Sequence, residues 1–557
     1  MISLVSALAK TPTHSHSSSR TIAFASIIWA SSIFLSRIMG LLREQIIGRS
    51  LGATREADLY FASFTLPDFL NYLLAAGALS VVFIPIFVEY VERDEHEGAW
   101  RALSVIANFI LIVGGLAIAL LMVFAKPLAG LVAPGFTGAG ELDNLTHLIR
   151  IILPAQLFLV VGGLLSAALQ AQDRHLLPAL APLVYSAGII LGGLIGSRVG
   201  ASADGFAWGV LIGAALGPFA LPLCGCMHSK MRWHPLFSLA NPDLKRYLWL
   251  SFPIMVGFSI VVVDEWIVKN QASYLPAGAL SYLQYGRTLM KVPIGVFGMA
   301  IGVASYPTIS RMVAAGSIVD AYGTLAHAVR LMLFVTFAAQ VCLTLAGFEA
   351  SYLIWGFMSH RFNAADAAAT GSVLAFLCLG LSRWAAQTVI SRGFYALGST
   401  WLPTAVGTAV AFCAVPLYVL LRQQNGAIGL AIASAIAIVV YVLLLGWLQY
   451  RRFSREAAAR GDSLDRVYGM LDPALRMGLA CGTAIGGGFL IRLLLPQFLL
   501  GMDFPSILVR SGTLCFVGLG FYLIIARLLG IHELAEVQEL IRRKLTHREL
   551  LPNKRGQ

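Results

Sequence analysis

Residues 21–43 read TIAFASIIWASSIFLSRIMGLLR, a mostly apolar stretch that is long enough to cross a bilayer, contains Arg37 and ends on Arg43. Arg37 lies roughly 23 Å along such a helix, which is too deep for an ordinary helix-end residue. A guanidinium inside a span costs at least about 2.5 kcal/mol unless it meets a water-filled cavity, a partner or an anionic ligand. We therefore expect the function to depend on these arginines.

The composition defines the fold class. Apolar residues make up 58% of the chain and charged residues 12%, which is typical of an all-α polytopic membrane protein. Apolar windows predict about fourteen transmembrane helices. They lie near 21–42, 57–90, 101–126, 146–171, 178–199, 203–227, 246–272, 278–310, 322–347, 366–395, 400–421, 426–449, 474–494 and 507–530.

Basic loop residues predict the orientation. They fall on one side of a fourteen-span arrangement, so both termini are expected in the cytoplasm. These residues are Lys10, Arg20, Arg174, Lys230, Arg232, Lys245, Arg246, Arg451, Arg452, Arg455, Arg460, Arg466, Arg542, Arg543 and Lys544. The net charge of +12 is spread over these short loops rather than gathered on one soluble domain, which argues against a nucleic-acid partner.

The chain repeats itself at a spacing of about 222 residues. ALSVVFIP at 78–85 matches AIGVASYP at 300–307, and QAQDRHLLP at 170–178 matches YALGSTWLP at 395–403. This offset predicts two pseudo-symmetric six-helix lobes in the same orientation, followed by a C-terminal helix pair. Two such lobes can rock around a central site, so this organisation indicates a transporter. A channel, an enzyme or a scaffold could retain the same duplication.

The expected domain limits follow from the spans and the repeat. They are a cytoplasmic segment 1–20, an N-lobe 21–227, a cytoplasmic connector 228–245, a C-lobe 246–449, a basic cytoplasmic loop 450–473, helices 13 and 14 within 474–530, and a basic cytoplasmic tail 531–557.

Charged residues inside the spans are the candidate site. Arg37 and Arg43 in the N-lobe and Arg287 in the C-lobe would bind a diphosphate between the lobes, since guanidinium groups match phosphate oxygens in bidentate fashion. Lys291 lies one turn after Arg287 on the same face and would support or gate the cavity, as would Asp58. The alternative is snorkelling and simple pairing, for example of Arg37 with Asp58.

A second polar group lies in the seventh span. Asp264 and Glu265 could carry a coupling ion, whereas Glu265 and Lys269 are also spaced as a helical ion pair. The chain has no Gly-rich phosphate loop, so the energy source would be a sodium or proton gradient or the membrane potential rather than a bound cofactor. No catalytic group and no metal site are expected.

A set of short motifs extends over nearly the whole chain. These motifs are SRIMGLLR at 36–43, Ala57-Asp58 with Leu66-Pro67, APGF at 133–136, Arg174 with Pro178-Ala179 and Pro182, YGR at 285–287, PIGVFG at 293–298 and GFY at 393–395. Together they resemble the MurJ (MviN) lipid II flippases of the multidrug/oligosaccharidyl-lipid/polysaccharide exporter superfamily.

The resemblance implies a non-enzymatic transporter in the bacterial inner membrane. It would move a polyprenyl-diphosphate-linked saccharide, the peptidoglycan precursor lipid II, among membrane lipids and with cell-wall synthesis proteins as partners. The family's diphosphate-binding arginines carry over to Arg37, Arg43 and Arg287, and its second-helix acid carries over to Asp58.

Several positions depart from the family pattern. Asn71, Tyr72 and Ala76 replace a basic pair and a glutamate, and Gly286 replaces an acid. A flippase for another lipid-linked glycan, such as an exopolysaccharide or O-antigen unit, therefore stays open. A cation-coupled drug exporter should carry acids rather than arginines in its cavity, and a scaffold that binds prenyl diphosphate without moving it is the remaining alternative.

Overall fold

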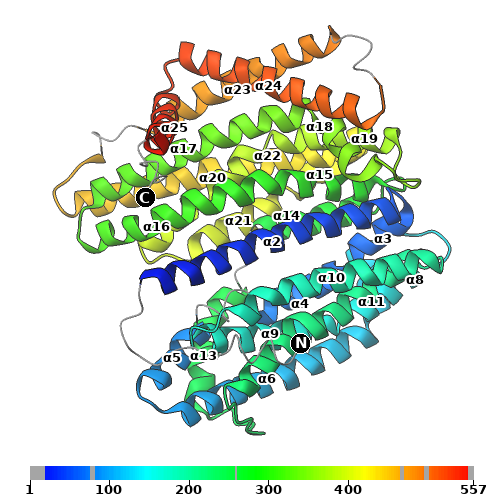
Figure 1. The fold of residues 1–557 in the computed structure, drawn as a ribbon, viewed down its shortest axis with the longest axis vertical. Coiled ribbons are helices and arrows are strands. Elements are labelled where there is room, and N and C mark those ends of the chain that lie inside the picture. The colour runs from blue at the N-terminus through cyan, green and yellow to red at the C-terminus, as the bar shows by residue number, and fades with distance from the viewer. Residues whose placement is uncertain (1–18, 76–81, 257–259, 465–468, 495–500, 550–557) are drawn as a thin grey trace, which may run out of the picture. The chain divides into compact units, whose positions relative to one another are not determined.

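The computed structural model describes residues 19–75, 82–256, 260–464, 469–494 and 501–549, and every regular element within these ranges is a helix (Figure 1). Nine described helices are long and apolar enough to cross a membrane, and a pair bent by 44° would add a tenth. Large apolar side chains such as Leu116, Val123 and Phe516 are exposed, as lipid-facing residues should be. The prediction of an all-α polytopic membrane protein is confirmed.

Ten of the predicted spans match these helices. They correspond to His96–Val123, Glu141–Gln170, Leu176–Arg198, Ser202–His228, Ala279–Ala314, Ile318–Leu345, Ala364–Cys378 with Leu381–Ala396, Val415–Ala458, Leu471–Leu493 and Phe504–Leu528. The count of fourteen is not confirmed. The predicted spans 57–90 and 246–272 each include residues outside the described ranges, and 400–421 contains a shorter apolar helix, Trp401–Cys413.

The described residues form two compact units. The first takes its residues from Met1–Glu44, Gly77–Ile118 and Pro154–Leu250, and the second from Gln45–Ala76, Ala119–Leu153 and Ser251–Gln557. The domain limits expected from the sequence, including the two lobes, stay predictions.

Two helices of the first unit pack closely through faces that are lined by glycine. Its helix α10 (Leu176–Arg198) runs beside α11 (Ser202–Ala214) (Figure 1). A Cβ atom on Gly192 would lie 2.4 Å from the carbonyl oxygen of Gly205, and one on Gly188 would lie 2.6 Å from Cα of Gly213. Glycines four residues apart on both helices therefore allow backbone contact, which is a common way for membrane helices to associate.

The first unit contains further helices beside this pair. They are α5 (Ile84–Glu92), α9 (Ala155–Gln170), the π-helical segment η2 (Ala215–Ala220) and α12 (Leu221–His228), together with most of α2 (Ser19–Leu51), α6 (His96–Val123) and α13 (Pro242–Val256). Pro218 lacks the amide hydrogen that a regular helix needs, which explains the π-helical turn at η2.

The second unit contains most of the helices. They are α3 (Arg55–Ser63), α4 (Thr65–Ala75), α7 (Ala125–Val132), α8 (Glu141–Ile152), α14 (Ile260–Ala272), α15 (Ala279–Pro293), η3 (Ile294–Gly298), α16 (Met299–Ala314), α17 (Ile318–Leu345), α18 (Gly347–Ser351), η4 (Tyr352–Gly356), α19 (Ala364–Cys378), α20 (Leu381–Ala396), α21 (Trp401–Cys413), α22 (Val415–Ala458), α23 (Leu471–Leu493), α24 (Phe504–Leu528) and α25 (His532–Glu549). Helix α22 changes direction at Gly426, whose φ of 56° suits a glycine.

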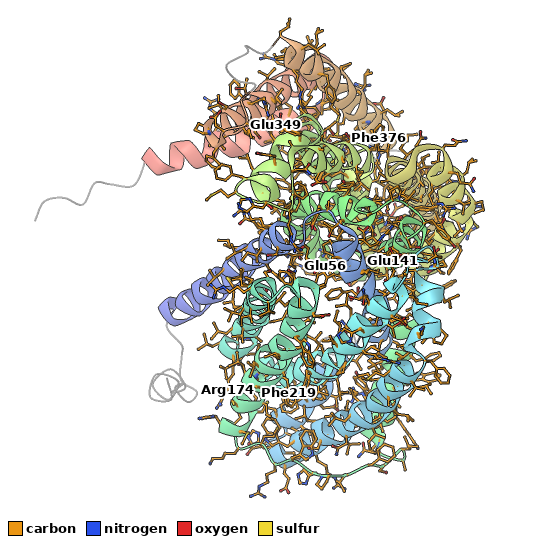
Figure 2. The ribbon with its side chains drawn as sticks, turned by 90° about the vertical axis from the view of Figure 1, so that its right-hand side faces the viewer. Glu56, Glu141, Arg174, Phe219, Glu349 and Phe376 are labelled. Carbon is orange, nitrogen blue, oxygen red and sulfur yellow. The ribbon has the colours of Figure 1, made fainter. Side chains whose placement is uncertain are left out.

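Buried charge holds the C-terminal helix pair in this unit. Glu349 of α18, labelled in Figure 2, is fully buried and accepts hydrogen bonds from Arg492 of α23 and Arg510 of α24, both at 2.9 Å. Asp503 caps α24 by accepting hydrogen bonds from Ser506, which hold the pKa of Asp503 below its ordinary value. The pair is therefore attached to the second unit by buried ion pairs as well as by apolar packing.

Candidate functional site

A buried polar cluster lies where three helices of the second unit meet. Arg287 of α15 donates a hydrogen bond from Nη2 to Oδ2 of Asp264 on α14 at 2.5 Å. Two hydroxyl groups of α22 complete the cluster: Ser434 donates to Oδ2 of Asp264 at 3.0 Å, and Tyr418 donates to its Oδ1. All four residues are at most 5% exposed. The structure thus brings together two residues that the sequence assigned to different roles.

The helix faces explain why Arg287 points inward. Leu283 and Met290, one turn before and one turn after it, are also buried, so Arg287 occupies the packed face of α15. On α14 the adjacent residue Val263 and Val268, one turn after Asp264, are also buried. An isolated charge on such a face would be costly, and the opposite charge on the neighbouring helix offsets that cost.

Arg287 nevertheless retains one unused donor. Its Nη2 atom lies 2.5 Å from Asp264 and 3.4 Å from the hydroxyl oxygen of Ser434, while its Nε atom is buried and has no hydrogen-bond partner in the described part of the chain. A buried donor without an acceptor is unfavourable, typically by about 1–3 kcal/mol. The guanidinium group is therefore incompletely satisfied by the described residues.

Two further ion pairs lie beside this cluster. Lys291 of α15 contacts Glu265 of α14 at 3.0 Å, and Lys269 of α14 lies 3.7 Å from Asp68 of α4. The helical pair between Glu265 and Lys269, considered from their spacing, is therefore not the pairing observed. Lys291 remains half exposed, so it can still respond to a charged ligand.

Asp58 fixes the start of the helix that carries Arg287. Its carboxylate accepts hydrogen bonds from the backbone N–H of Gly278 at 2.7 Å, the backbone N–H of Ser281 at 2.8 Å and the Ser281 hydroxyl at 2.6 Å. Gly278 is the N-cap residue of α15, with φ of 90°. A carboxylate at a helix N-terminus satisfies free N–H groups and complements the helix dipole. The role of Asp58 in supporting or gating a cavity stays a prediction.

Arg55 balances the charge of Asp58, which the sequence analysis did not anticipate. Its guanidinium group lies 3.7 Å from Asp58 and 3.1 Å from Glu141 of α8, a residue labelled in Figure 2, and it stacks 5.0 Å from the ring centre of Phe136. The sequence contained one indication of this contact, because the motif APGF at 133–136 includes Phe136.

Arg37 and Arg43 lie on α2 in the first unit. The side chain of Arg37 is exposed. Arg43 is 27% exposed and contacts its neighbour Glu44 at 2.8 Å. Both cations are accessible to a ligand, and their placement with Arg287 in one cavity stays a prediction.

The departures from the family pattern have distinct surroundings. Asn71 and Tyr72 are half-buried on α4, whereas Ala76 lies outside the described residues. Gly286 is buried on α15, and a Cβ atom there would lie 3.2 Å from Cδ1 of Leu377 on α19. A larger residue at Gly286 would therefore require the Leu377 side chain to move by a few tenths of an ångström.

These helices define a multi-pass membrane protein with buried charges in its spans. The family model for MurJ, described as lipid II flippase MurJ, matches residues 47–487. The chain therefore belongs to the MurJ family, which is a family of transporters rather than enzymes.

Individual relatives agree with the family match. A probable lipid II flippase MurJ of Rhizobium tropici is 27% identical over 529 residues, covering 91% of this chain and 94% of the relative. The lipid II flippase MurJ of Burkholderia cenocepacia is 27% identical, covering 68% of this chain and 73% of the relative.

Solved structures show the same fold. A lipid II flippase MurJ in an inward closed conformation has a TM-score of 0.71 at 22% identity, covering 90% of this chain and 99% of that one. An inward-facing multidrug resistance transporter of the MATE family has a TM-score of 0.63 at 15% identity, covering 74% of this chain and 94% of that one.

Proposed function

We propose that this protein translocates undecaprenyl-diphosphate-linked peptidoglycan precursor, lipid II, across the bacterial inner membrane by alternating access. The observation that carries the proposal is the family match over residues 47–487, together with a relative described as lipid II flippase MurJ. The accessible arginines of α2 support it, since a membrane-embedded transporter needs cations to compensate a diphosphate.

In this mechanism each charged residue has a specific task. Arg37 and Arg43 bind the diphosphate, and Arg287 contributes its unused Nε donor. Asp58 holds the N-terminus of α15 and thereby positions Arg287, while Lys291 supplies a nearby half-exposed cation. The prenyl tail stays in lipid while the headgroup crosses.

The cellular location, the partners and the energy source are proposed on the basis of the same function. We place the protein in the inner membrane of a bacterium with both termini in the cytoplasm, where basic loops favour retention. Cell-wall synthesis proteins that make or use lipid II are the expected partners. A sodium or proton gradient or the membrane potential would drive the movement.

A flippase for another lipid-linked glycan is the second candidate. Asn71 and Tyr72 of α4 favour it, because half-buried neutral side chains replace the basic pair of the family pattern. A drug exporter fits less well, since accessible arginines on α2 would repel cationic drugs. A scaffold that binds prenyl diphosphate would show binding without movement.

Reconstitution tests these alternatives directly. Purified protein in liposomes should move fluorescent lipid II between leaflets, and Arg37→Ala or Arg43→Ala should reduce the rate at least about ten-fold through loss of a charge-assisted contact. Arg101→Ala, which removes an exposed arginine of α6 outside the proposed site, is the matched control. Movement of another lipid-linked glycan but not of lipid II would establish the second candidate, and binding without movement would establish the scaffold.

A further inference from the structure

The segment between α12 and α13, residues 229–241, is held against the membrane helix α6, and we call it the connector strap. None of its residues belongs to a helix or a strand. The side-chain amide of Asn108 donates to the carbonyl oxygens of His234 and Leu236 at 2.8 and 3.0 Å. The backbone N–H of His234 donates to the hydroxyl oxygen of Ser104 at 3.1 Å. Two polar side chains of α6 therefore bind the backbone of the strap.

These contacts lie within the apolar part of α6. Arg101 is the last charged residue of that helix, and Asn108 follows roughly 10 Å further along it at 1.5 Å per residue. Non-helical backbone is tolerated at membrane depth only where other groups satisfy its polar atoms, which Ser104 and Asn108 do for the middle of the strap. This depth indicates that the strap enters the interfacial layer of the membrane.

The strap also exposes large apolar side chains. Trp233, Leu236, Phe237 and Leu239 are each at least 39% exposed. Four such groups within a short segment form an apolar patch, which acyl chains would cover at the boundary of the headgroups. Tryptophan is enriched at the level of the lipid headgroups, so Trp233 is suited to this depth.

Both ends of the strap are fixed within the first unit. At its start, the N–H of Met231 donates to the carbonyl oxygen of Cys226 in α12 at 3.0 Å. At its end, α13 begins beside α5 (Figure 1), where the Tyr90 hydroxyl donates to Asp243 at 3.1 Å. A segment held in this way loses little conformational freedom when a ligand binds, which favours binding.

A cavity of about 460 Å³ lies beside the start of the strap. Arg174, labelled in Figure 2, donates to the hydroxyl oxygen of Ser229 in its wall at 2.7 Å. The polar residues that line the cavity are His96, Glu97, Gln172, Ser229, Lys230 and Arg232.

Two cations of this cavity are available to an anion. The exposed side chain of Lys230 has no hydrogen-bond or ion-pair partner among the described residues. Arg232 is 74% exposed and lies 4.0 Å from Glu97, which is a loose contact. The remaining acid nearby, Asp94, faces His96 at 3.2 Å. The charge of Lys230 is therefore not balanced within this group.

The backbone of Lys230 is also unusual. Its φ of 58° is left-handed, at the end of a helix where glycine is the common residue. Other residues in this conformation reduce stability, and they cluster at functional sites. The lysine side chain is thus present beside the cavity although the local backbone would favour glycine.

We propose that the connector strap and this cavity bind an anionic phospholipid in the leaflet that faces the cytoplasm. Lys230 and Arg232 contact its phosphodiester group, while Trp233, Leu236 and Phe237 contact the glycerol and acyl-chain region. Basic pockets between membrane helices on the cytoplasmic side bind anionic lipid headgroups. The leaflet follows from the orientation predicted by the basic loops, whereas the site does not depend on the cargo.

Photoreactive phosphatidylglycerol and phosphatidylcholine test the site on the purified full chain in nanodiscs. A reactive group on the phosphatidylglycerol headgroup should label residues 230–232, and one on the acyl chain should label 233–239. Lys230→Gln combined with Arg232→Gln should lower the preference for phosphatidylglycerol about thirty-fold, because each cation near an anionic surface contributes a factor of about five. Arg451→Gln combined with Arg455→Gln, which removes the same charge from α22, is the matched control and should leave the preference unchanged.

Lys230→Gly separates binding from folding. Glycine suits the left-handed backbone, so the Tm of this variant should be at least that of the unaltered protein, while the preference for phosphatidylglycerol falls about five-fold. An unchanged preference would overturn the role of Lys230, whatever the Tm.

The other outcomes decide the remaining parts of the proposal. Equal labelling of the unaltered protein by the two lipids would overturn the anionic site, and an acyl-chain probe that leaves 233–239 unlabelled would overturn insertion of the strap. Inorganic phosphate that competes as well as phosphatidylglycerol would assign the cavity to a soluble anion and overturn the lipid. Failure of lipid II movement in liposomes would refute the proposed function without changing these results.

Discussion

Replacing Asp58 with asparagine tests how the helix carrying Arg287 is held. Oδ1 of Asp58 accepts from Ser281 N–H and from its hydroxyl, and Oδ2 accepts from Gly278 N–H at 2.7 Å. The amide of Asp58→Asn has one acceptor oxygen, so its NH₂ group must face at least one of these donors. A buried donor left unsatisfied costs about 1–3 kcal/mol, and the lost charge at the helix N-terminus adds about 0.5–1 kcal/mol.

We therefore expect Asp58→Asn to lower the free energy of unfolding by about 1.5–4 kcal/mol. Ser281→Ala is the matched control, because it removes the hydroxyl bond, keeps both backbone bonds and should cost about 1 kcal/mol. Denaturant unfolding in detergent measures both, and hydrogen exchange should show faster exchange at the first turn of α15 in Asp58→Asn. The reasoning fails if Asp58→Asn is no less stable than Ser281→Ala, or if exchange in that turn is unchanged.

Two further substitutions test the packing of the second unit. Glu349→Gln leaves Arg510 buried without its counter-ion and should lower the free energy of unfolding by about 3 kcal/mol, which Tm measurements in detergent can check; unchanged stability would contradict this. Gly48→Ala places a Cβ atom 2.1 Å from the ring of Trp355 and should reduce Tm, whereas Gly40→Ala on the same helix meets nothing within 4 Å. Equal Tm values for the two alanine variants would refute the close contact.

Two charged residues of the buried cluster could be singled out from the sequence because ions inside apolar spans are costly. Arg287 and Asp264 were both recognised on this ground, and the structure places them in contact. Tyr418 and Ser434 were missed, since hydroxyl side chains are common in membrane helices and can bond to their own backbone. Their role depends on α22 packing against α14, which no local pattern in the sequence reveals.

Hydrogen-bond and ion-pair partners that lie far apart in the chain could not be predicted from the sequence either. Asp58 accepts hydrogen bonds from Gly278 and Ser281, more than 200 positions away, so the sequence could suggest only that this acid supports or gates the cavity. The helical spacing of Glu265 and Lys269 suggested a local pair, but α15 offers Glu265 a closer partner in Lys291. The contact between the two helices therefore determines the ion pair of Glu265, and the spacing within α14 does not.

Helix number was harder to predict than helix type. Hydropathy identifies apolar windows, but it does not show where a proline or glycine divides them. Pro293 precedes a π-helical segment, and Gly426 bends α22, so apolar windows and helices do not correspond one to one.

Rescue of a bacterium depleted of its own lipid II flippase tests the central claim most directly, with lipid II measured on each face of the inner membrane. We expect the unaltered protein to restore growth and to bring lipid II to the outer face, while Arg37→Ala, expressed at the same level, does neither. Normal expression without rescue, with lipid II accumulating on the inner face, would contradict lipid II transport.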